Sequence, residues 1–443
     1  MRFIRSLYLT NRFLYSASAI SLLFFISYFA SELFFTTSFL LLVLVILLIV
    51  DILFLYSRKY EIISHRILTD RFSNGDDNEV KLIVTNSYPY EVKIRIIDEL
   101  PVEFQIRDFE ILSCLESNQT KYYSYHIRPV KRGEYTFGAM NIYVQARIGL
   151  ISRRYRFDSV KTVAVYPSIT QMKKYGLMAI SNRLTDVGIK KIRRIGHSLE
   201  FDQIKEYVLG DDHTTINWKA TARRNQLMVN HYMDEKAQQV YSVIDMGRNM
   251  KMPFDGMALL DYAINTSLII SNISILKQDK AGIVTFNNKI TSLLPAERNS
   301  SQMKKILELL YNQQTAFLES DYEKMAAVIK TKIKQRSLLL LYTNFESLSS
   351  LRRQINYFRA LSASHLVIVI FFFNTGLNSI LSRDTKSIES VYHKVIAEKL
   401  AYEKRQIVKE LARYGIQSIL TEPDKLSVNT INKYLELKAR GMI

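Results

Sequence analysis

The chain of 443 residues has few of the residues that usually build catalytic or metal centres. It has one cysteine, seven histidines, one tryptophan and 14 glycines. The single cysteine, Cys114, excludes an intramolecular disulfide and agrees with a reducing compartment. The scarce glycines form no phosphate-binding or dinucleotide-binding pattern, and no serine or cysteine stands in the setting of a nucleophile. The sequence therefore favours a protein that is not an enzyme and that carries no cofactor.

The charge is strongly one-sided, with 60 Lys and Arg against 42 Asp and Glu and a net charge of +18. Such an excess fits either an anionic membrane surface or a nucleic acid. The basic residues are dispersed apart from residues 190–194, and no zinc, helix-turn-helix or aromatic RNA-binding pattern accompanies them. We therefore expect the lipid bilayer as partner and no nucleic acid; a solvated basic surface without a partner is the remaining alternative.

Two long apolar runs lie back to back near the start of the chain, over residues 13–35 and 36–56. Each has about the 20 residues that a helix needs to cross a bilayer. No small-residue cleavage site separates them, which argues against a cleaved signal peptide. The sequence therefore predicts two transmembrane helices within residues 1–58. A hydrophobic core hairpin of a soluble domain is the alternative.

The cations around these runs set the expected orientation. They lie outside both runs, at Arg2, Arg5, Arg12, Arg58 and Lys59. Both ends of the hairpin are therefore predicted on the cytoplasmic side of the inner membrane, with the bulk of the chain in the cytoplasm. Asp51, near the end of the second run, is expected to reach water or lipid head groups.

Residues 60–170 have the pattern of a sheet-based domain. Segments such as 80–85 and 91–97 alternate apolar and polar residues, and loops with Asn, Gly and Pro separate them. No stretch of helical periodicity interrupts the series. The pattern predicts a β-sandwich that serves as a scaffold or docking module.

From residue 240 to 443 the pattern changes to alternating strands and helices. The predicted strands are Val240–Ile244, Ala281–Phe286, Ser337–Thr343, Leu366–Phe373 and Ile416–Leu420. The predicted helices lie near Met257–Gln278, Ser301–Asn312, Asp321–Lys334, Leu348–Leu361, Ser387–Arg413 and Ser427–Lys438. Continuous apolar strands are typical of a parallel sheet covered on both faces. The fold class is therefore α/β, with a doubly wound parallel sheet in this part of the chain.

Between these two parts, residues 171–239 are predicted to form a linker and a polar segment. This segment mixes carboxylates, cations and aromatics at close quarters, at Glu200, Phe201, Glu206, Tyr207, Gly210, Asp211, Asp212, Trp218, Lys219 and Arg223. Lys219 and Arg223 would share one face of a helical turn. Unpaired charges beside Trp218 would be costly if buried, which favours an internal ionic network. A cationic face turned to an acidic partner is the alternative.

A candidate metal site lies where two predicted parallel strands end. Ligands of doubly wound sheets bind outside the carboxyl ends of the strands. Asp245 begins a loop similar to the Asp-x-Ser-x-Ser metal loop of von Willebrand factor A domains, but Gly247 and Asn249 stand where hydroxyls belong. Asn344 stands where that family has a later Asp. One carboxylate remains among the hard oxygen ligands that Mg²⁺ needs, which argues against stable binding.

Asp211, Asp212 and His213 suggest a second, catalytic interpretation. Paired carboxylates beside a histidine occur in metal-dependent hydrolases. With Asp245 they would make a Mg²⁺-dependent hydrolase such as a phosphodiesterase. No further histidine or acidic cluster with matching spacing lies nearby. A turn in which the Asp side chains bond backbone N–H groups is therefore favoured.

The chain resembles the bacterial "domain of unknown function 58" family. The polar segment is similar to that family's pattern in Glu200-Phe201, Lys205-Glu206-Tyr207, Gly210-Asp211-Asp212 and Ile216-Asn217-Trp218-Lys219-Ala220-Thr221-Ala222-Arg223. The departures from it are Lys205 for Arg, Asn217 for Asp and Thr221 for Ser. We call residues 198–235 the signature segment.

The resemblance implies two membrane spans, a β-sandwich, the signature segment and a von Willebrand A-like domain. Such proteins are typically encoded beside MoxR-type AAA+ ATPases, which are proposed to remodel partner complexes. The resemblance therefore implies a membrane-anchored adaptor that recruits such an ATPase and its client. Other envelope proteins are alternative partners, and a purely structural role in the envelope is a third interpretation.

Overall fold

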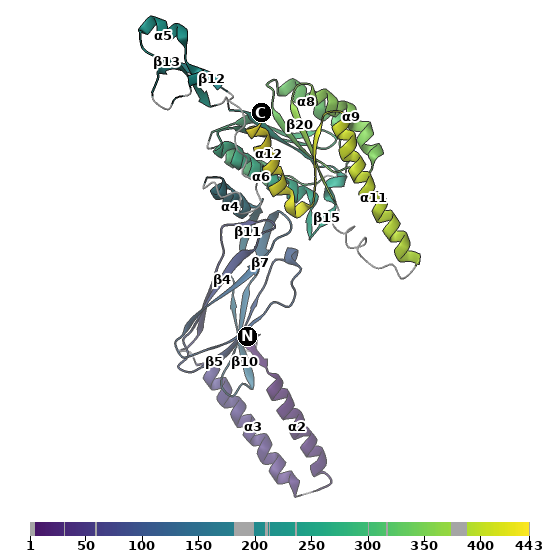
Figure 1. Cartoon of the computed structure of the whole chain (residues 1–443). Helices are drawn as coiled ribbons and strands as arrows, with labels where there is room; N and C mark the ends of the chain where they lie inside the picture. The colour runs from purple at the N-terminus through teal and green to yellow at the C-terminus, as the bar shows by residue number, and fades with distance from the viewer. Residues whose placement is uncertain are drawn as a thin grey trace. The chain divides into compact units, whose positions relative to one another are not determined.

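The computed structural model describes residues 5–30, 32–57, 60–180, 199–208, 211, 213–234, 237–299, 301–315, 318–373 and 388–442. The chain divides into two compact units, residues 1–166 and 167–443 (Figure 1). The first unit holds the apolar helices and a region of β-sheets. The second holds a mixed sheet with helices and the signature segment.

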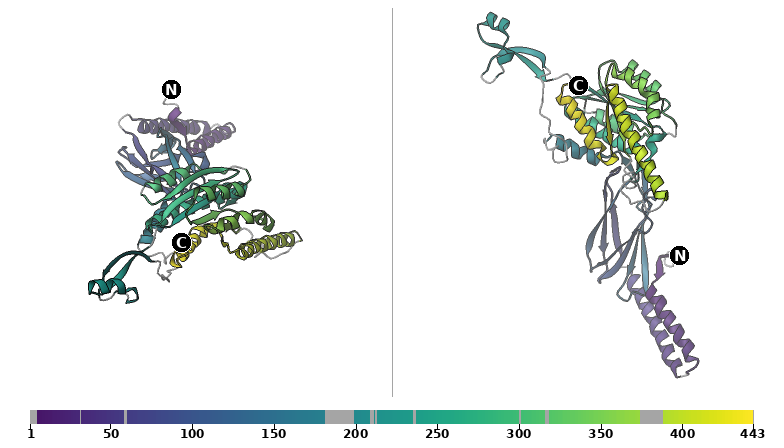
Figure 2. Two further views of the ribbon diagram at one scale, coloured as in Figure 1. Left: turned by 90° about the horizontal axis from the view of Figure 1, so that it is seen from above. Right: turned by 45° about the vertical axis from the view of Figure 1, so that its right-hand side comes forward.

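In the first unit a short strand, β1 (Leu7–Leu9), precedes two helices packed side by side, α2 (Asn11–Ser27) and α3 (Leu33–Leu55) (Figures 1 and 2). Phe24 and Phe34 join them through an edge-to-face ring contact. Helix α3, with 23 residues and a mean hydropathy of 3.2, is long and apolar enough to cross a membrane. Helix α6 (Leu259–Leu276) is also long and apolar enough to cross a membrane, but 78% of its 18 residues are buried, as in the core helix of a soluble protein.

Three sheets follow in the first unit, with strand orders β1-β10-β9-β5-β6, β2-β4-β7 and β3-β11-β8. The strands are β1 (Leu7–Leu9), β2 (Ile62–Ile67), β3 (Arg71–Ser73), β4 (Asn78–Asn86), β5 (Val92–Asp98), β6 (Ile111–Leu115), β7 (Thr120–Ile127), β8 (Gly133–Phe137), β9 (Met140–Gln145), β10 (Ile151–Phe157) and β11 (Lys161–Tyr166). Alternate side chains, such as Val80, Leu82 and Val84 of β4, enter one shared core. The predicted sheet-based region is confirmed.

The apolar helices are fixed to this sheet region by hydrogen bonds. Asp51 of α3 is buried and accepts the backbone N–H groups of Leu150 and Ile151 at 2.8 and 3.0 Å. Thr10, which precedes α2, donates its hydroxyl to the carbonyls of Gly149 and Leu150 at 2.7 and 2.9 Å. The prediction that Asp51 reaches water or head groups is therefore wrong, because its carboxylate is used inside the protein.

The carbonyl end of α3 is also occupied. Tyr88 and Tyr90 donate their hydroxyls to the carbonyls of Leu55 and Phe54 at 2.8 and 2.9 Å. Arg153 donates to the same Leu55 carbonyl. The last carbonyls of a helix lack intrahelical partners and carry partial negative charge, so hydroxyls and a guanidinium stabilise them.

The second unit contains a six-stranded sheet with the order β18-β17-β14-β19-β20-β21. Its strands are β14 (Gln239–Asp245), β17 (Lys280–Phe286), β18 (Ile290–Glu297), β19 (Leu338–Tyr342), β20 (Leu366–Phe372) and β21 (Gln417–Thr421). All neighbours are parallel except the edge strand β18. The five predicted strands are confirmed, while β18 was not predicted.

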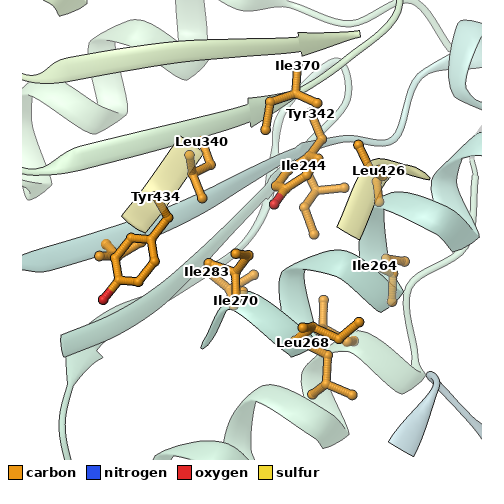
Figure 3. Close-up of a cluster of buried hydrophobic side chains, with 14 of the residues drawn as sticks. Ile244, Ile264, Leu268, Ile270, Ile283, Leu340, Tyr342, Ile370, Leu426 and Tyr434 are labelled. Atoms are coloured by element: carbon orange, nitrogen blue, oxygen red, sulfur yellow. The ribbon is translucent and has the colours of Figure 1, made fainter. Parts of the chain in front are cut away.

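Helices cover both faces of this sheet. They are α6, α7 (Gln302–Tyr311), α8 (Tyr322–Lys332), α9 (Leu348–Ser362), α11 (Ile388–Arg413) and α12 (Leu426–Ala439). Side chains of α6 and α12 meet one face of the sheet at Ile244, Leu340 and Ile370 (Figure 3). Residues of α8, α9 and α11 pack on the other face, against Val243 and Leu341. Alternate residues of one strand thus serve two cores, which explains its continuous apolar sequence.

The predicted linker begins with a helix instead. Residues 169–180 form α4 (Ile169–Ile180), so the prediction of a linker is wrong for this stretch. Asn265 of α6 accepts the backbone N–H of Ser168 at 2.9 Å. Met172, Tyr175 and Met178 of α4 pack on the core that α6 lines, and this burial favours a helix.

Candidate functional site

The carboxyl edge of the parallel sheet brings the predicted metal-site residues together. β14 ends at Asp245, and the neighbouring strand β19 ends just before Thr343 and Asn344. Asp245 is 2% exposed. Asn249, in the turn after β14, donates its side-chain amide to the carbonyl of Asn344 at 3.3 Å.

Four donors surround the Asp245 carboxylate. The N–H of Gly247 reaches Oδ1 at 2.8 Å, and the hydroxyl of Ser320 donates to the same oxygen. The hydroxyls of Tyr322 and Thr343 reach Oδ2 at 2.9 and 2.7 Å. A carboxylate offers about four lone-pair sites, so these bonds use all of them. The buried charge is stabilised by donors and does not depend on a counter-ion.

Gly247 occupies its place because a side chain does not fit there. A Cβ at this position would lie 2.1 Å from the Ser320 hydroxyl. A serine at residue 247, as in the Asp-x-Ser-x-Ser loop of von Willebrand factor A domains, would therefore collide with Ser320. Ser320, in the segment before α8, instead places a hydroxyl next to the Asp245 carboxylate.

Tyr322 acts as a neutral donor at this edge. Complete burial, and secondarily the neighbouring Asp245 charge, raise the pKa of its phenol well above the ordinary value of 10.0. Its hydroxyl also lies 2.7 Å from that of Thr343. The phenol therefore keeps its proton at physiological pH and holds the carboxylate in place.

A lysine contacts the residues that follow β19 at this edge of the sheet. Lys404 of α11 donates from Nζ to Oδ1 of Asn344 at 2.7 Å and to the carbonyl of Phe345. Its ammonium lies 5.7 Å from the centre of the Phe371 ring. Burial lowers the pKa of Lys404 to about 8, against a smaller opposing effect of Glu346. The partly desolvated ammonium of Lys404 is therefore hydrogen-bonded to the Asn344 side-chain oxygen that a metal ion would need as a ligand.

These residues do not fit a divalent cation. The oxygens of Asp245 accept four donors, and the side-chain oxygen of Asn344 accepts Lys404. Mg²⁺ requires oxygens whose lone pairs point to the ion. The sequence located Asp245, Asn249 and Asn344 but missed Ser320, Tyr322 and Lys404. No local pattern marks these three, because they come from other elements of the fold.

The signature segment forms a separate structural motif. β12 (Leu199–Glu206) and β13 (Met228–Asp234) pair antiparallel, with a short 3₁₀ turn, η3 (His213–Thr215), and the helix α5 (Trp218–Arg224) between them (Figures 1 and 2). Asp211 accepts Lys205 Nζ at 3.0 Å and the N–H of Val208 at 3.1 Å. The predicted Asp turn is confirmed for Asp211.

Helix α5 is fixed at its start and along its length. Asn217 accepts the N–H of Ala220 at 3.0 Å as N-cap and donates to Asn230 of β13 at 2.8 Å. The Thr221 hydroxyl accepts the N–H of Met228 at 3.0 Å. Asn and Asp cap helices about equally well. Asn217 therefore caps the helix as the family's Asp would, and Thr221 keeps the hydroxyl of the family's Ser.

The outer residues of α5 face solvent. Trp218 is 69% exposed, and Lys219 and Arg223 are exposed as well. The prediction of a buried network around these three side chains is wrong, because the helix is held by Asn217 and Thr221 instead. Glu206 is exposed and Tyr207 half-buried. Gly210, Asp212 and the side chains of Glu200 and Phe201 lie outside the described residues.

Among the described residues of the predicted hydrolase site, neither Asp211 nor His213 is a hydrogen-bond partner of Asp245, and Asp212 lies outside the described residues. His213 is exposed on η3, and Asp211 is bonded to Lys205 and Val208. The hydrogen-bond partners of Asp245 come from other residues. Within the described parts of the chain, no group of three or more His, Cys, Asp or Glu residues is arranged to hold a metal.

Comparison with known sequences gives one family and one curated relative. The model of the family described as "Protein of unknown function DUF58" matches residues 203–375. The relative is the uncharacterized protein YeaD of Bacillus subtilis (strain 168), 23% identical over 189 residues. The match covers 42% of this chain and 44% of the relative, so the chain spans less than half of that protein's length.

Comparison with solved structures gives distant matches. The conserved hypothetical protein BatB of Bacteroides thetaiotaomicron is 12% identical, with a TM-score of 0.31, over 46% of this chain and 98% of that one. The PapD-like domain 7 of human CEP192 is 19% identical, with a TM-score of 0.20, over 25% of this chain and 88% of that domain. Neither likeness is close enough to assign an activity or a partner.

Proposed function

Because the chain belongs to the DUF58 family through residues 203–375, we propose that it is a membrane-anchored adaptor that docks a MoxR-type AAA+ ATPase and its client in the cytoplasm. The observation that carries the proposal is the exposed Trp218 beside Lys219 and Arg223, on a helix fixed by Asn217 and Thr221. Exposed tryptophan and arginine are the residues that most often dominate protein interfaces.

The cations beside Trp218 define the chemistry of the partner. Lys219 and Arg223 share one face of α5, and in the described residues neither forms an ion pair. Their charges are free to meet a carboxylate-rich surface, which would guide association and fix the orientation of the partner. The docking surface consists of Trp218, Lys219 and Arg223, and its occupant is an acidic face of the ATPase.

The remaining parts of the chain position this surface. Helices α2 and α3 form a membrane hairpin with both ends in the cytoplasm, as the flanking cations favour. The sheet region is a β-sandwich scaffold, and the mixed sheet with helices on both faces is a von Willebrand A-like domain. Hydrolysis by Asp211, Asp212, His213 and Asp245 gains no support from Asp245, since its oxygens are fully hydrogen-bonded.

The proposal is tested by capture of the purified cognate ATPase on the full chain in detergent, with ATP, with ADP and with EDTA. Trp218→Ala/Arg223→Ala is compared with the wild type. Truncation of central interface residues costs about 2 kcal/mol or more, so capture should fall at least about thirtyfold in the nucleotide state that supports it.

Tyr392→Ala/Arg405→Ala is the matched control, because both residues are exposed on α11. It should capture the ATPase as the wild type does. Failure of the wild type to retain the ATPase in every nucleotide state would overturn the proposal. If Trp218→Ala/Arg223→Ala captured the ATPase as well as the control and the wild type do, the docking surface would not lie on α5. Metal-dependent phosphodiesterase turnover that Asp211→Asn abolishes would favour the hydrolase instead.

A further inference from the structure

An open hollow of about 700 Å³ lies in the first unit, where the apolar helix α2 begins. Its floor is the outer face of the sheet β1-β10-β9-β5-β6. Alternation along β5 points Val92, Ile94 and Ile96 to the core and leaves Lys93 and Arg95 exposed beneath the hollow. The size falls in the range of small-molecule sites.

The lining is cationic. Arg12, Lys93 and Arg95 contribute three cations, and Glu110 contributes one carboxylate. Glu110 lies 3.8 Å from Arg95, with both side chains about half exposed, so this pair is weak. Arg12 uses one N–H on the Ile148 carbonyl at 3.3 Å. The cations therefore keep donors for an anion, and guanidinium groups suit phosphate oxygens.

The position of the hollow indicates the source of that anion. Arg12 lies in the first turn of α2, so a helix that enters the bilayer here sets the hollow at head-group depth. The rings of Tyr8 and Tyr143, 5.2 Å apart edge to face, line it, and tyrosine is enriched at this depth. The exposed side chains of Leu9 and Leu112 add apolar contacts at the same place.

We propose that this hollow binds the phosphate head group of an anionic phospholipid of the leaflet into which α2 inserts. The cations would hold the phosphate, the tyrosines would lie among the glycerol groups, and the leucines would contact the start of the acyl chains. The inference rests on the membrane anchorage in the proposed function, but it does not require the ATPase. The first unit would then prefer anionic phospholipids as well as anchor the chain in the membrane.

The test is native mass spectrometry of the full chain released from detergent micelles. The micelles are supplemented with phosphatidylglycerol, with phosphatidylcholine or with inorganic phosphate. Lys93→Gln/Arg95→Gln removes two cations from the hollow. Lys81→Gln/Arg156→Gln removes two exposed cations of the same unit outside it and serves as the matched control. Each basic residue near an anionic surface contributes about fivefold in affinity, so two should contribute about thirtyfold.

Phosphatidylglycerol should bind the wild type and the control alike, and the Lys93/Arg95 variant about thirtyfold more weakly. Equal binding of phosphatidylcholine, or unchanged binding by that variant, would overturn the inference. Inorganic phosphate that competes with the lipid at equal concentration would make the hollow a free-anion site and reject the lipid. Lys93→Gln alone replaces the double variant if that protein does not keep the wild-type melting temperature.

Two failures remain distinguishable. A chain that does not float with lipid vesicles on a density gradient would contradict the membrane anchor in the proposed function. A chain that floats but binds phosphatidylglycerol equally with and without Lys93 and Arg95 would contradict only the lipid site. Capture of the ATPase is measured separately and does not affect either result.

Discussion

Asp51 lies in the most apolar of the described helices, and its carboxylate accepts the backbone N–H of Leu150 at 2.8 Å. A second bond from Ile151 strengthens the same link between α3 and the start of β10. With Thr10 bonded to the carbonyls of Gly149 and Leu150, both helices are tied to one turn of the sheet region. The hairpin and the sheets should therefore move as one body.

Asp51→Ala should lower the free energy of unfolding of the first unit by about 3 kcal/mol, because two buried N–H groups lose a charged acceptor. Asp51→Asn should cost less, since its amide oxygen can accept the same N–H groups. Thermal unfolding of the full chain in detergent measures both. Ser38→Ala, which removes a hydroxyl bonded only within α3, is the control. Equal melting of Asp51→Ala and Ser38→Ala would contradict the link.

Asn217→Ala should unravel the first turn of α5, because it removes the N-cap bond to Ala220 and the bond to Asn230. Loss of such a cap costs about 1 kcal/mol. Trp218 is the single tryptophan and lies next to the cap, so its fluorescence anisotropy should fall. Asn217→Asp keeps a cap acceptor and should retain the wild-type anisotropy. A drop in both variants would show that the Asn230 bond, and not the cap, orders the helix.

The sequence predicts the second unit well because each of its central strands is buried on both faces. Residues 366–373 were predicted as a strand, and β20 is Leu366–Phe372. The edge strand β18 was missed because it is half-exposed and contains Pro295. The hairpin of β12 and β13 was missed because its charged and aromatic residues follow neither periodicity. Asp51 was misread because its partners lie about one hundred residues away along the chain.

The candidate site was half predictable for a related reason. Asp245 and Asn344 could be placed together because the carboxyl ends of neighbouring parallel strands meet at one edge. Ser320, Tyr322 and Lys404 could not, because a loop and two helices bring them there. The exposure of Trp218 was also unpredictable, since charged neighbours are compatible with either a buried network or a surface.

Millimolar Mg²⁺ and EDTA should leave the melting temperature of the wild type unchanged. A metal that binds only the folded state raises stability, and Asp245 has no lone pair left for one. Asn344→Asp/Lys404→Met adds a carboxylate and removes the ammonium but leaves the four donors of Asp245 in place, so this variant should also show no Mg²⁺-dependent rise. A rise in the wild type that Asp245→Asn abolishes would contradict the assignment.

Lys404 gives the site a pH dependence whose sign follows from its lowered pKa. The pKa is about 8 in the folded chain against an ordinary value of 10.5. Below pH 8 the amine is charged in both states, and folding bears the full cost of burying the charge. Between pH 8 and 10.5 the unfolded chain binds more protons, so stability rises with pH. The neutral amine keeps two N–H groups for Asn344 and Phe345.

Urea unfolding of the wild type and of Lys404→Met across this pH range measures the effect. The free energy of unfolding of the wild type, taken relative to Lys404→Met, should increase from pH 8 to 10.5. Lys399→Met, an exposed residue of the same helix, should show no such change relative to the wild type. A flat or falling difference for Lys404→Met would mean that the ammonium is solvated and does not hold the Asn344 side chain.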